Sequence, residues 1–556
     1  MIQATLAQVA PQIPEIPWGA LSPELVLFGA GIIVLLLETA GETRVRVGSL
    51  GFVLTVAAAA TWFVLTEQIV GPSLLAVAAL VVLGLTVLFR LRPRVLSAVL
   101  SALGLTATLG VIAWQWIVTS AEGRLLGSEL QPEQVLADTI AVDGIALFTR
   151  ITVCLAALIA IPLGYQYLED RRMHRGEYYP LLIFAAVGMN LLASAQDLIM
   201  VFISIEILSL ALYIMTGFAK RDLRSQEGAF KYFLLGAFSS AILLYGIALA
   251  YGVAGSTNVA AVGAAMSAAD APTGLTLAAL AFLIVGLAFK TALVPFHMWT
   301  PDVYQGAPTP VTGFMAAATK AAAFAAFLRL FSGAFAGLEW SWVPVLWTLA
   351  ALTMIVGAVL AVVQDDVKRM LAYSAVAHAG YALIGIVAVN RDGVSGVLFY
   401  LLAYAIMSLG AFGVLAMLEQ RQRKAISIAD LRGFGKRYPV PAGMLALFLL
   451  SLAGIPGTAG FMGKLAVFRA GVAGGQWTLV VIGVVSSVIA AYFYVRVIRA
   501  MFMEDEPEEL AELPLQTTLG TTTALTATSA AVVVLGILPT VLVDVAGQAT
   551  LIAGIG

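Results

Sequence analysis

Charged residues are scarce in this sequence: they make up 11% of its 556 residues, whereas a soluble globular protein has about 25%. The mean hydropathy is correspondingly high, at +0.98. A chain with so few charges cannot cover itself with a surface that water solvates, so lipid must supply most of its surroundings. The composition therefore excludes an ordinary soluble enzyme and predicts an integral membrane protein in contact with the lipid bilayer.

Cysteine and histidine are nearly absent as well. The chain has one cysteine, Cys154, inside an apolar run, and three histidines. These are too few for the usual ligand sets of iron–sulfur clusters or haem, so we expect no disulfide, metal site or redox cofactor in this chain. A net charge of −2 gives no indication of nucleic-acid binding, and no glycine-rich phosphate loop follows a predicted strand.

Long apolar runs fill almost the whole sequence, each able to cross about 30 Å of hydrocarbon as a helix. They predict an all-α polytopic membrane protein of about 14–16 transmembrane helices, forming one membrane domain without a soluble insertion. The predicted spans are 22–38, 47–66, 73–90, 95–118, 144–163, 178–194, 198–218, 229–254, 275–295, 309–331, 343–363, 371–389, 395–418, 439–468, 477–500 and 517–545.

Basic residues separate sharply when the connections between spans are numbered alternately. One set of connections holds 21 Lys and Arg residues, and the opposite set holds only Arg124, Arg329, Arg391 and Arg469. Because basic residues gather on the cytoplasmic side, both termini are predicted to face outside. The larger set comprises Arg44, Arg46, Arg90, Arg92, Arg94, Arg171, Arg172, Arg175, Lys220, Arg221, Arg224, Lys368, Arg369, Arg421, Arg423, Lys424, Arg432, Lys436, Arg437, Arg496 and Arg499.

Five further basic residues lie inside predicted spans, where a charge at the bilayer centre costs about 2.5–3.5 kcal/mol. They are Arg150, Lys231, Lys290, Lys320 and Lys464. Arg150 is interpreted as a side chain that snorkels to the interface, and Lys231 has the same alternative. The last three point to a polar route, as does Glu206, which lies roughly 12 Å into its span.

Two predicted spans are interrupted beside such a lysine. Prolines 295, 301, 308 and 310 follow Lys290 in LAFKTALVPFHMWTPDVYQGAPTP, and Gly454, Pro456, Gly457 and Gly460 precede Lys464 in SLAGIPGTAGFMGK. Backbone groups freed by such breaks persist in a membrane only against protein or a water-filled cavity. A structural kink is the alternative, but the pattern favours lysines that meet water or polar backbone.

The two broken spans are the ninth and the fourteenth, five apart. Because five is odd, a repeat of five spans must have inverted topology, as in many ion-coupled transporters. The predicted repeats cover about 178–331 and 343–500. The same offset pairs the span of Glu206 with the span of His378, which could relay a proton or simply be a hydrogen-bonded buried histidine. His297 stands at the first break, and His174 lies in a basic loop.

Three sequence blocks resemble the antiporter-like subunits of respiratory complex I, and among them the subunit N branch. They are VPFHMWTPDVYQGAPTPV, GEYYPLLIFAAVGMNLLASAQDLIMVFISIEILSL and VKRMLAYSAVAHAGY. The similarity runs from about Asp143 to about Phe502. The subunit M branch carries glutamate where this chain has Lys464, which argues against that branch. The resemblance gives no role for the extra spans near 73–118.

The resemblance implies a proton-conducting core at 143–503, preceded by N-terminal transmembrane helices at 1–142 and followed by a loop and last helix at 504–556. Matched by motif, its charged axis comprises Glu206, Lys231, Lys290, Lys320 and Lys464. The implied function is proton conduction in the membrane arm of a proton-pumping NADH:quinone oxidoreductase of a bacterial-type inner membrane. K-like and M-like subunits would be neighbours, and quinone, FMN and iron–sulfur clusters would belong to partner subunits.

The expected mechanism uses a lysine that changes its protonation state. Desolvation disfavours an ammonium group and a nearby carboxylate favours it. We therefore expect Glu206 to control Lys290, with Lys320 and His378 as central relays and Lys464 as the exit group. Two alternatives remain open at this point: a subunit of a stand-alone multisubunit cation/proton antiporter, and a structural membrane scaffold with vestigial charges.

Overall fold

The computed structural model describes residues 21–35, 93–121, 139–171, 173, 176–422, 426–505, 515 and 517–550. Within these ranges the chain is helical and has no strand, only three isolated bridges between loops. The predicted spans 47–66 and 73–90, and His174, lie outside the described residues. The all-α class is confirmed.

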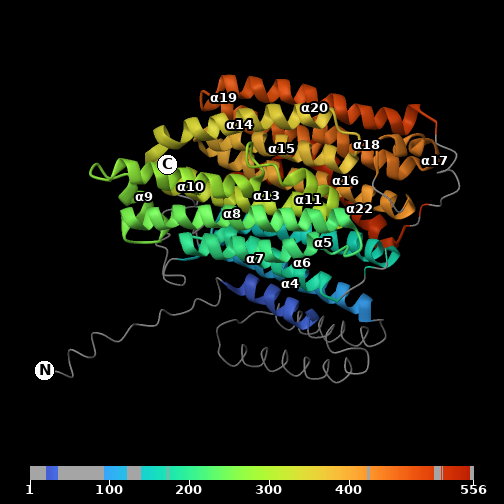
Figure 1. Ribbon diagram of the computed structural model, residues 1–556, viewed down its shortest axis with the longest axis horizontal. Helices are drawn as coiled ribbons and strands as arrows, with labels where there is room; N and C mark the ends of the chain where they lie inside the picture. The colour runs from blue at the N-terminus through green and yellow to red at the C-terminus, as the bar shows by residue number, and fades with distance from the viewer. Residues whose placement is uncertain are drawn as a thin grey trace.

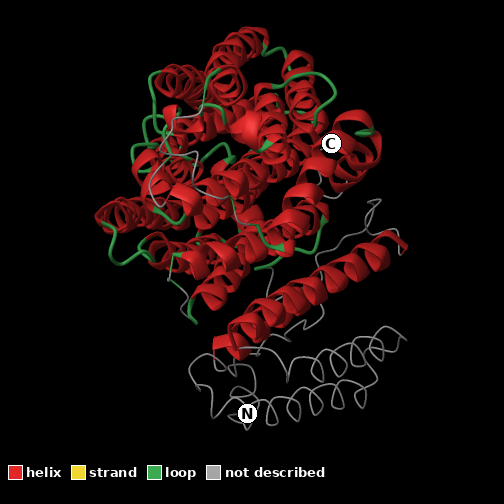
Figure 2. Ribbon diagram, turned by 90° about the vertical axis from the view of Figure 1, so that its right-hand side faces the viewer, coloured by secondary structure: helices red, strands yellow, loops and turns green. Residues whose placement is uncertain are grey.

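The helices lie side by side with their long axes nearly aligned, as Figure 1 shows, and Figure 2 looks along the bundle. The first described helix is Leu21–Leu35. The others are α4 (Pro93–Ala121), α5 (Gly144–Asp170), α6 (Tyr178–Ser194), α7 (Leu198–Thr216), α8 (Leu223–Ala254), α9 (Val259–Met266), α10 (Thr273–Thr291), α11 (Thr300–Gly306), α12 (Thr309–Phe314), the π-helix η1 (Met315–Thr319), α13 (Lys320–Phe327), the π-helix η2 (Leu328–Ala334), η3 (Ala336–Leu338), α14 (Glu339–Val362), α15 (Val367–Val387), α16 (Arg391–Gln422), η4 (Ala429–Leu431), α17 (Phe434–Arg437), α18 (Pro439–Ala453), α19 (Ala459–Ala473), α20 (Trp477–Met503), α22 (Leu519–Ile537) and α23 (Thr540–Thr550).

Aspartates in the loops begin several of these helices. Asp143, Asp197, Asp222 and Asp366 each accept hydrogen bonds from backbone N–H groups in the first turn of α5, α7, α8 and α15. Such caps satisfy donors that the helix itself leaves unpaired. The polar residues between spans therefore fix where the apolar helices start.

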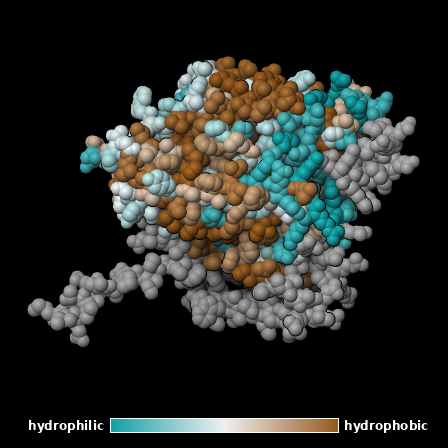
Figure 3. Space-filling model, in the orientation of Figure 1, coloured by the Kyte–Doolittle hydropathy of each residue, from teal (hydrophilic) through white to brown (hydrophobic). Residues whose placement is uncertain are grey.

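Eleven of the described helical segments are long and apolar enough to cross a membrane, and three shorter ones, Leu21–Leu35, α6 and α18, are apolar as well. Apolar residues cover much of the face seen in Figure 3, and hydrophilic residues gather at the end of the bundle where α17 lies. Among the candidate spans described, the continuous helix from α12 to η2 and the middle of α16 are the most deeply buried, and α4, α8, α20 and α22 are the most exposed.

Both predicted breaks are confirmed. The ninth predicted span stops at Thr291, and the chain resumes as a helix with α11 at Thr300. The fourteenth predicted span is divided into α18 and α19. Predicted span 517–545 is wrong as a single helix, because α22 ends at Ile537 before Pro539 and α23 follows separately. The order of elements places a broken span fourth in each predicted set of five, but the inverted symmetry of the repeats stays a prediction.

Those residues of the larger basic set that the structure describes lie at one end of the bundle, which we call the basic end; Lys220, Arg369 and Lys436 mark it. Two residues that the sequence assigned to loops are instead buried. Lys368 is 3% exposed and Arg329 is 7% exposed. Each pairs with a carboxylate remote in sequence, Arg329 with Asp143 and Lys368 with Glu419.

Candidate functional site

Lys290 is buried in the last turn of α10, directly before the first break. Its ammonium group donates a hydrogen bond of 2.5 Å to the hydroxyl of Ser209 on α7. It also lies over the rings of Tyr213 and Tyr232, 5.7 and 5.6 Å from their centres. Aromatic faces attract a cation, so this environment accepts a charged lysine without a carboxylate in direct contact.

Glu206 stands one turn before Ser209 on the same helix. Its carboxylate accepts a hydrogen bond from Ser240 on α8. No ion pair joins Glu206 to Lys290 among the described residues, where ion pairs are contacts within 4.0 Å. Lys290 instead contacts Ser209, one turn beyond Glu206 on α7, and the pairing of Glu206 with Lys290 stays a prediction.

Lys320 lies at the centre of the bundle, where the π-helix η1 passes into α13. Its ammonium group donates to the backbone carbonyl of Ala375 on α15 and lies 5.5 Å from the centre of the Tyr404 ring. A π-helical turn is uncommon and is often found at functional sites. The sequence placed Lys320 near the middle of its span but gave no sign of this turn.

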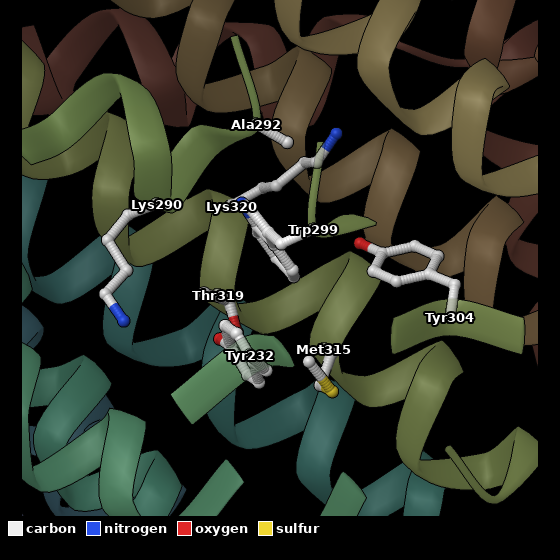
Figure 4. A pocket seen from close by; sticks show the side chains of 8 residues that line it. All are labelled: Tyr232, Lys290, Ala292, Trp299, Tyr304, Met315, Thr319 and Lys320. Carbon is white, nitrogen blue, oxygen red and sulfur yellow. The ribbon is translucent and has the colours of Figure 1, made fainter. Parts of the chain in front are cut away.

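A narrow cavity separates Lys290 from Lys320. No part of it is wide enough for a water-sized sphere. Figure 4 shows the two lysines on different sides, with Trp299 between them and their ammonium groups pointing in different directions. The buried hydroxyls of Tyr232 and Thr319 line this space and have no hydrogen-bond partner among the residues that the structure describes. Unsatisfied buried hydroxyls beside a gap are the groups that bind water when a site opens.

His378 occupies the middle of α15, three residues beyond the carbonyl that holds Lys320. Its Nδ1 shares a hydrogen bond of 2.6 Å with the hydroxyl of Tyr400, and its Nε2 lies 3.3 Å from the hydroxyl of Tyr494. Both ring nitrogens therefore have partners that can donate or accept a proton. The geometry suits the predicted relay and also suits a hydrogen-bonded core histidine.

Lys464 is buried on α19 and reaches back across the second break. It donates to the carbonyl of Ala453, 2.9 Å away, and to the hydroxyl of Ser487 at 2.6 Å. Ala453 is the last residue of α18, so the break supplies the free carbonyl that the sequence predicted. Gly454 follows with φ +87°, and a Cβ there would lie 3.0 Å from the Lys464 side chain. Glycine both permits this backbone conformation and leaves room for the lysine.

Lys231 lies apart from this buried row. Its side chain is 39% exposed and forms ion pairs of 2.6 Å with Glu227 and Asp302. Along α8 it is nine residues from Ser240, about 13 Å at the helical rise. Asp302 also accepts from Arg369. The structure thus assigns Lys231 to a polar network at the basic end, and its part in proton conduction stays a prediction.

The interpretation of Arg150 as a snorkelling side chain is wrong. Arg150 is 0% exposed, lies 2.7 Å from the carboxylate of Glu24 on helix Leu21–Leu35, and donates to Ser194 on α6. Because Glu24 comes from a part of the sequence far from α5, no local pattern predicted this pair. Only the cost of an unpaired buried arginine pointed to a partner.

Arg329 forms a second unpredicted pair at the end opposite to the basic end. It donates two hydrogen bonds, of 2.8 and 2.6 Å, to Asp143 and one to the carbonyl of Ala193. The sequence signal for this pair was Asp143 itself, a carboxylate directly before the apolar run that forms α5. His297, at the first break, is part-buried, with its ring 6.4 Å from that of Tyr373, and it does not join the lysine row.

The row Glu206, Lys290, Lys320, His378 and Lys464 thus crosses the bundle from α7 to α19, and each member is hydrogen-bonded to a hydroxyl or carbonyl group. Lysine can take up and release a proton, and the surrounding hydroxyls can pass one on. Within the described residues no group of three or more His, Cys, Asp or Glu side chains could hold a metal ion. The arrangement is therefore suited to proton movement within the membrane.

Comparisons with known proteins give the family. A family model described as NADH:quinone oxidoreductase/Mrp antiporter matches residues 195–490. Proteins named NADH-quinone oxidoreductase subunit N are 43% identical over 539 residues in Rhodococcus opacus, covering 96% of both chains, and 42% identical over 577 residues in Beutenbergia cavernae, covering 97% and 98%. The chain belongs to the NADH-quinone oxidoreductase subunit N family.

Solved structures agree with this membership. A chain of respiratory complex I from Thermus thermophilus with bound aureothin is 34% identical, with a TM-score of 0.66, over 84% of this chain and 98% of that one. A chain of the Mrp complex from Dietzia is 23% identical, with a TM-score of 0.70, over 82% and 92%. The second likeness shows the fold alone. The predicted resemblance is confirmed, and it extends beyond the blocks that carried it.

Proposed function

We propose that this chain is a membrane-arm subunit of a proton-pumping NADH:quinone oxidoreductase and that it conducts protons along the row from Glu206 to Lys464. The observation that carries the proposal is the burial of three lysines, Lys290, Lys320 and Lys464, each held by hydroxyl or carbonyl groups. Buried cations in a membrane are expensive and usually functional. Family membership supplies the enzyme, and the row supplies the role of this chain in it.

Glu206 controls Lys290 in this proposal. With its charge close by, the carboxylate favours the ammonium form, and when it is neutralised or withdrawn, desolvation favours release of the proton. The released proton must cross the cavity to reach Lys320. Because that cavity is too narrow for water here, conduction requires the side chains around Trp299 to separate so that water can bridge Tyr232 and Thr319.

From Lys320 the proton passes towards His378 and then Lys464. The carbonyl of Ala375 accepts a hydrogen bond from Lys320, and His378 lies within one turn of Ala375 on α15. One helix therefore carries both groups. Lys464 is the exit group, and its hydrogen bond to Ser487 on α20 leads towards the bundle surface. The direction of net transfer depends on which end faces the cytoplasm.

The partial exposure of Glu206 also indicates that a neighbouring subunit covers this part of α7. The Glu206 side chain is only partly buried, on a face of α7 where Leu210 is 54% and Ile203 is 43% exposed. A carboxylate facing lipid is costly, so another membrane-arm subunit covers this face. K-like and M-like subunits are the proposed neighbours, with FMN, iron–sulfur clusters and quinone in partner subunits. The proposed location is a bacterial-type cell membrane, with the basic end inside and both termini outside.

The test is proton pumping by the assembled complex in membrane vesicles driven by NADH. Lys290→Met keeps most of the bulk and removes the titratable group, so pumping should fall strongly. Lys290→Arg should also impair pumping, because arginine stays charged and cannot release a proton. Glu206→Gln should impair it by removing the charge that favours protonated Lys290.

Lys436→Met is the matched control, because Lys436 is an exposed lysine paired with Asp505 at the basic end. It should leave pumping unchanged. Assembly of every variant is checked on native gels. Normal pumping by fully assembled Lys290→Met complex would show that Lys290 is structural and would overturn the proposed function.

A further inference from the structure

A buried carboxylate that the lysine row does not use lies near the basic end of the bundle. Glu419, close to the end of α16, is 4% exposed. It accepts hydrogen bonds from the hydroxyls of Tyr167, at 2.9 Å, and Thr309, at 2.5 Å. The ammonium group of Lys368 lies 3.5 Å away, and the guanidinium group of Arg171 lies 4.0 Å away.

The two cations differ in their access to water. Lys368 is buried and donates to the carbonyl of Ala307 at 2.7 Å, which places it on the interior side of Glu419. Arg171 has a side chain that is 25% exposed, and it also donates to the backbone carbonyl of Glu419 at 3.2 Å. Glu419 therefore stands between the interior and a cation that reaches the surface of the basic end.

Hydroxyl groups continue from Glu419 towards the lysine row. Thr309 begins α12, and Thr312, one turn later, donates to the carbonyl of Tyr304 at 3.1 Å. Tyr304 lines the cavity between Lys290 and Lys320. Thr309 and Lys320 are eleven residues apart on one continuous helix, about 16 Å at the helical rise. Hydroxyl groups of α12 thus lie between the basic end and the cavity.

We propose that Glu419 is a further proton-carrying residue, which transfers protons between water at the basic end and the cavity beside Lys320. The inference rests on the proposed function. A proton from water beside Arg171 binds a carboxylate oxygen of Glu419 and forms an O–H bond, which neutralises the carboxylate. That bond then breaks as the proton passes to the oxygen of the Thr309 hydroxyl, while Thr309 gives its own hydrogen to water on the cavity side, and Glu419 returns to its charged form beside Lys368.

A purely structural ion pair is the competing explanation, and a charge-neutral double variant separates the two. Glu419→Gln alone leaves Lys368 buried without its carboxylate, which is strongly destabilising whichever explanation holds. Glu419→Gln with Lys368→Met removes both charges and keeps similar bulk. If Glu419 carries protons, the assembled double variant loses NADH-driven pumping in vesicles. If the pair is only structural, the double variant assembles and pumps normally, which would overturn the inference.

Glu419→Asp provides the conservative comparison, because it keeps a titratable carboxyl group, and it should restore pumping relative to the double variant. A second measurement tests the inference even if the double variant assembles poorly. Infrared difference spectra of the wild-type complex during turnover should show a protonated-carboxyl band that shifts in Glu419→Asp. An unchanged band would also overturn the inference.

The result with Lys290→Met distinguishes the two proposals. Loss of pumping in Lys290→Met with normal pumping in the Glu419/Lys368 double variant would reject the role of Glu419 and leave the proposed function intact. Normal pumping in assembled Lys290→Met would instead reject the proposed function itself.

Discussion

Replacing Arg150 with methionine tests whether the buried pair with Glu24 holds the N-terminal helix against the core. Arg150 and Glu24 are 0% and 4% exposed, so the pair belongs with buried ion pairs and not with surface pairs, which contribute about 0–1 kcal/mol. Removing one partner of a buried pair costs about 3–5 kcal/mol, because the other charge stays buried. Had Arg150 snorkelled to the interface, the same change would cost little.

The double variant Arg150→Met with Glu24→Gln is the matched control. It leaves no buried charge, so its main loss is the hydrogen bond from Arg150 to Ser194, worth about 1 kcal/mol. The double variant should therefore be more stable than the single variant, although it carries more changes. This reversal is specific to a buried pair.

The single cysteine of the chain supplies the assay. Cys154 is fully buried one turn beyond Arg150 on α5, so alkylation of its thiol reports opening of this region. Membranes containing the assembled complex are heated in steps with an alkylating reagent, and the modified Cys154 peptide is quantified by mass spectrometry. Arg150→Met should lower the midpoint by several degrees. A midpoint equal to wild type would refute a stabilising role for the pair.

Three further predictions use the same complex. Arg329→Met leaves its buried carboxylate partner unpaired and should destabilise the protein by about 3–5 kcal/mol, seen as a smaller assembled fraction on native gels; full assembly after heating would contradict it. Gly454→Ala strains a backbone at φ +87° and crowds Lys464, so pumping should fall more than assembly, whereas equal losses would indicate a folding defect alone. For topology, an impermeant maleimide added to intact cells should label a cysteine that replaces exposed Asp270 but not one that replaces exposed Arg221. The opposite labelling pattern would show that the basic end faces outside.

Sequence alone determined the class of the protein, because hydropathy and length report the solvent that a segment requires. The positions of most described spans, and both helix breaks, followed from apolar runs and from prolines and glycines acting locally. The buried lysines Lys290, Lys320 and Lys464 were also identifiable, because a charge within an apolar run needs no knowledge of its neighbours to be unusual.

Tertiary structure decided which groups those charges meet. Ser209, the Ala375 carbonyl and Ser487 come from helices remote in sequence from the lysines that they hold, and single-sequence periodicity carries no information on such pairing. The same limit explains the errors at Arg150 and at Lys368. The sequence around a basic residue near the end of a span is the same whether its side chain reaches water or a carboxylate elsewhere in the chain. Only the packing of the helices distinguishes these two outcomes.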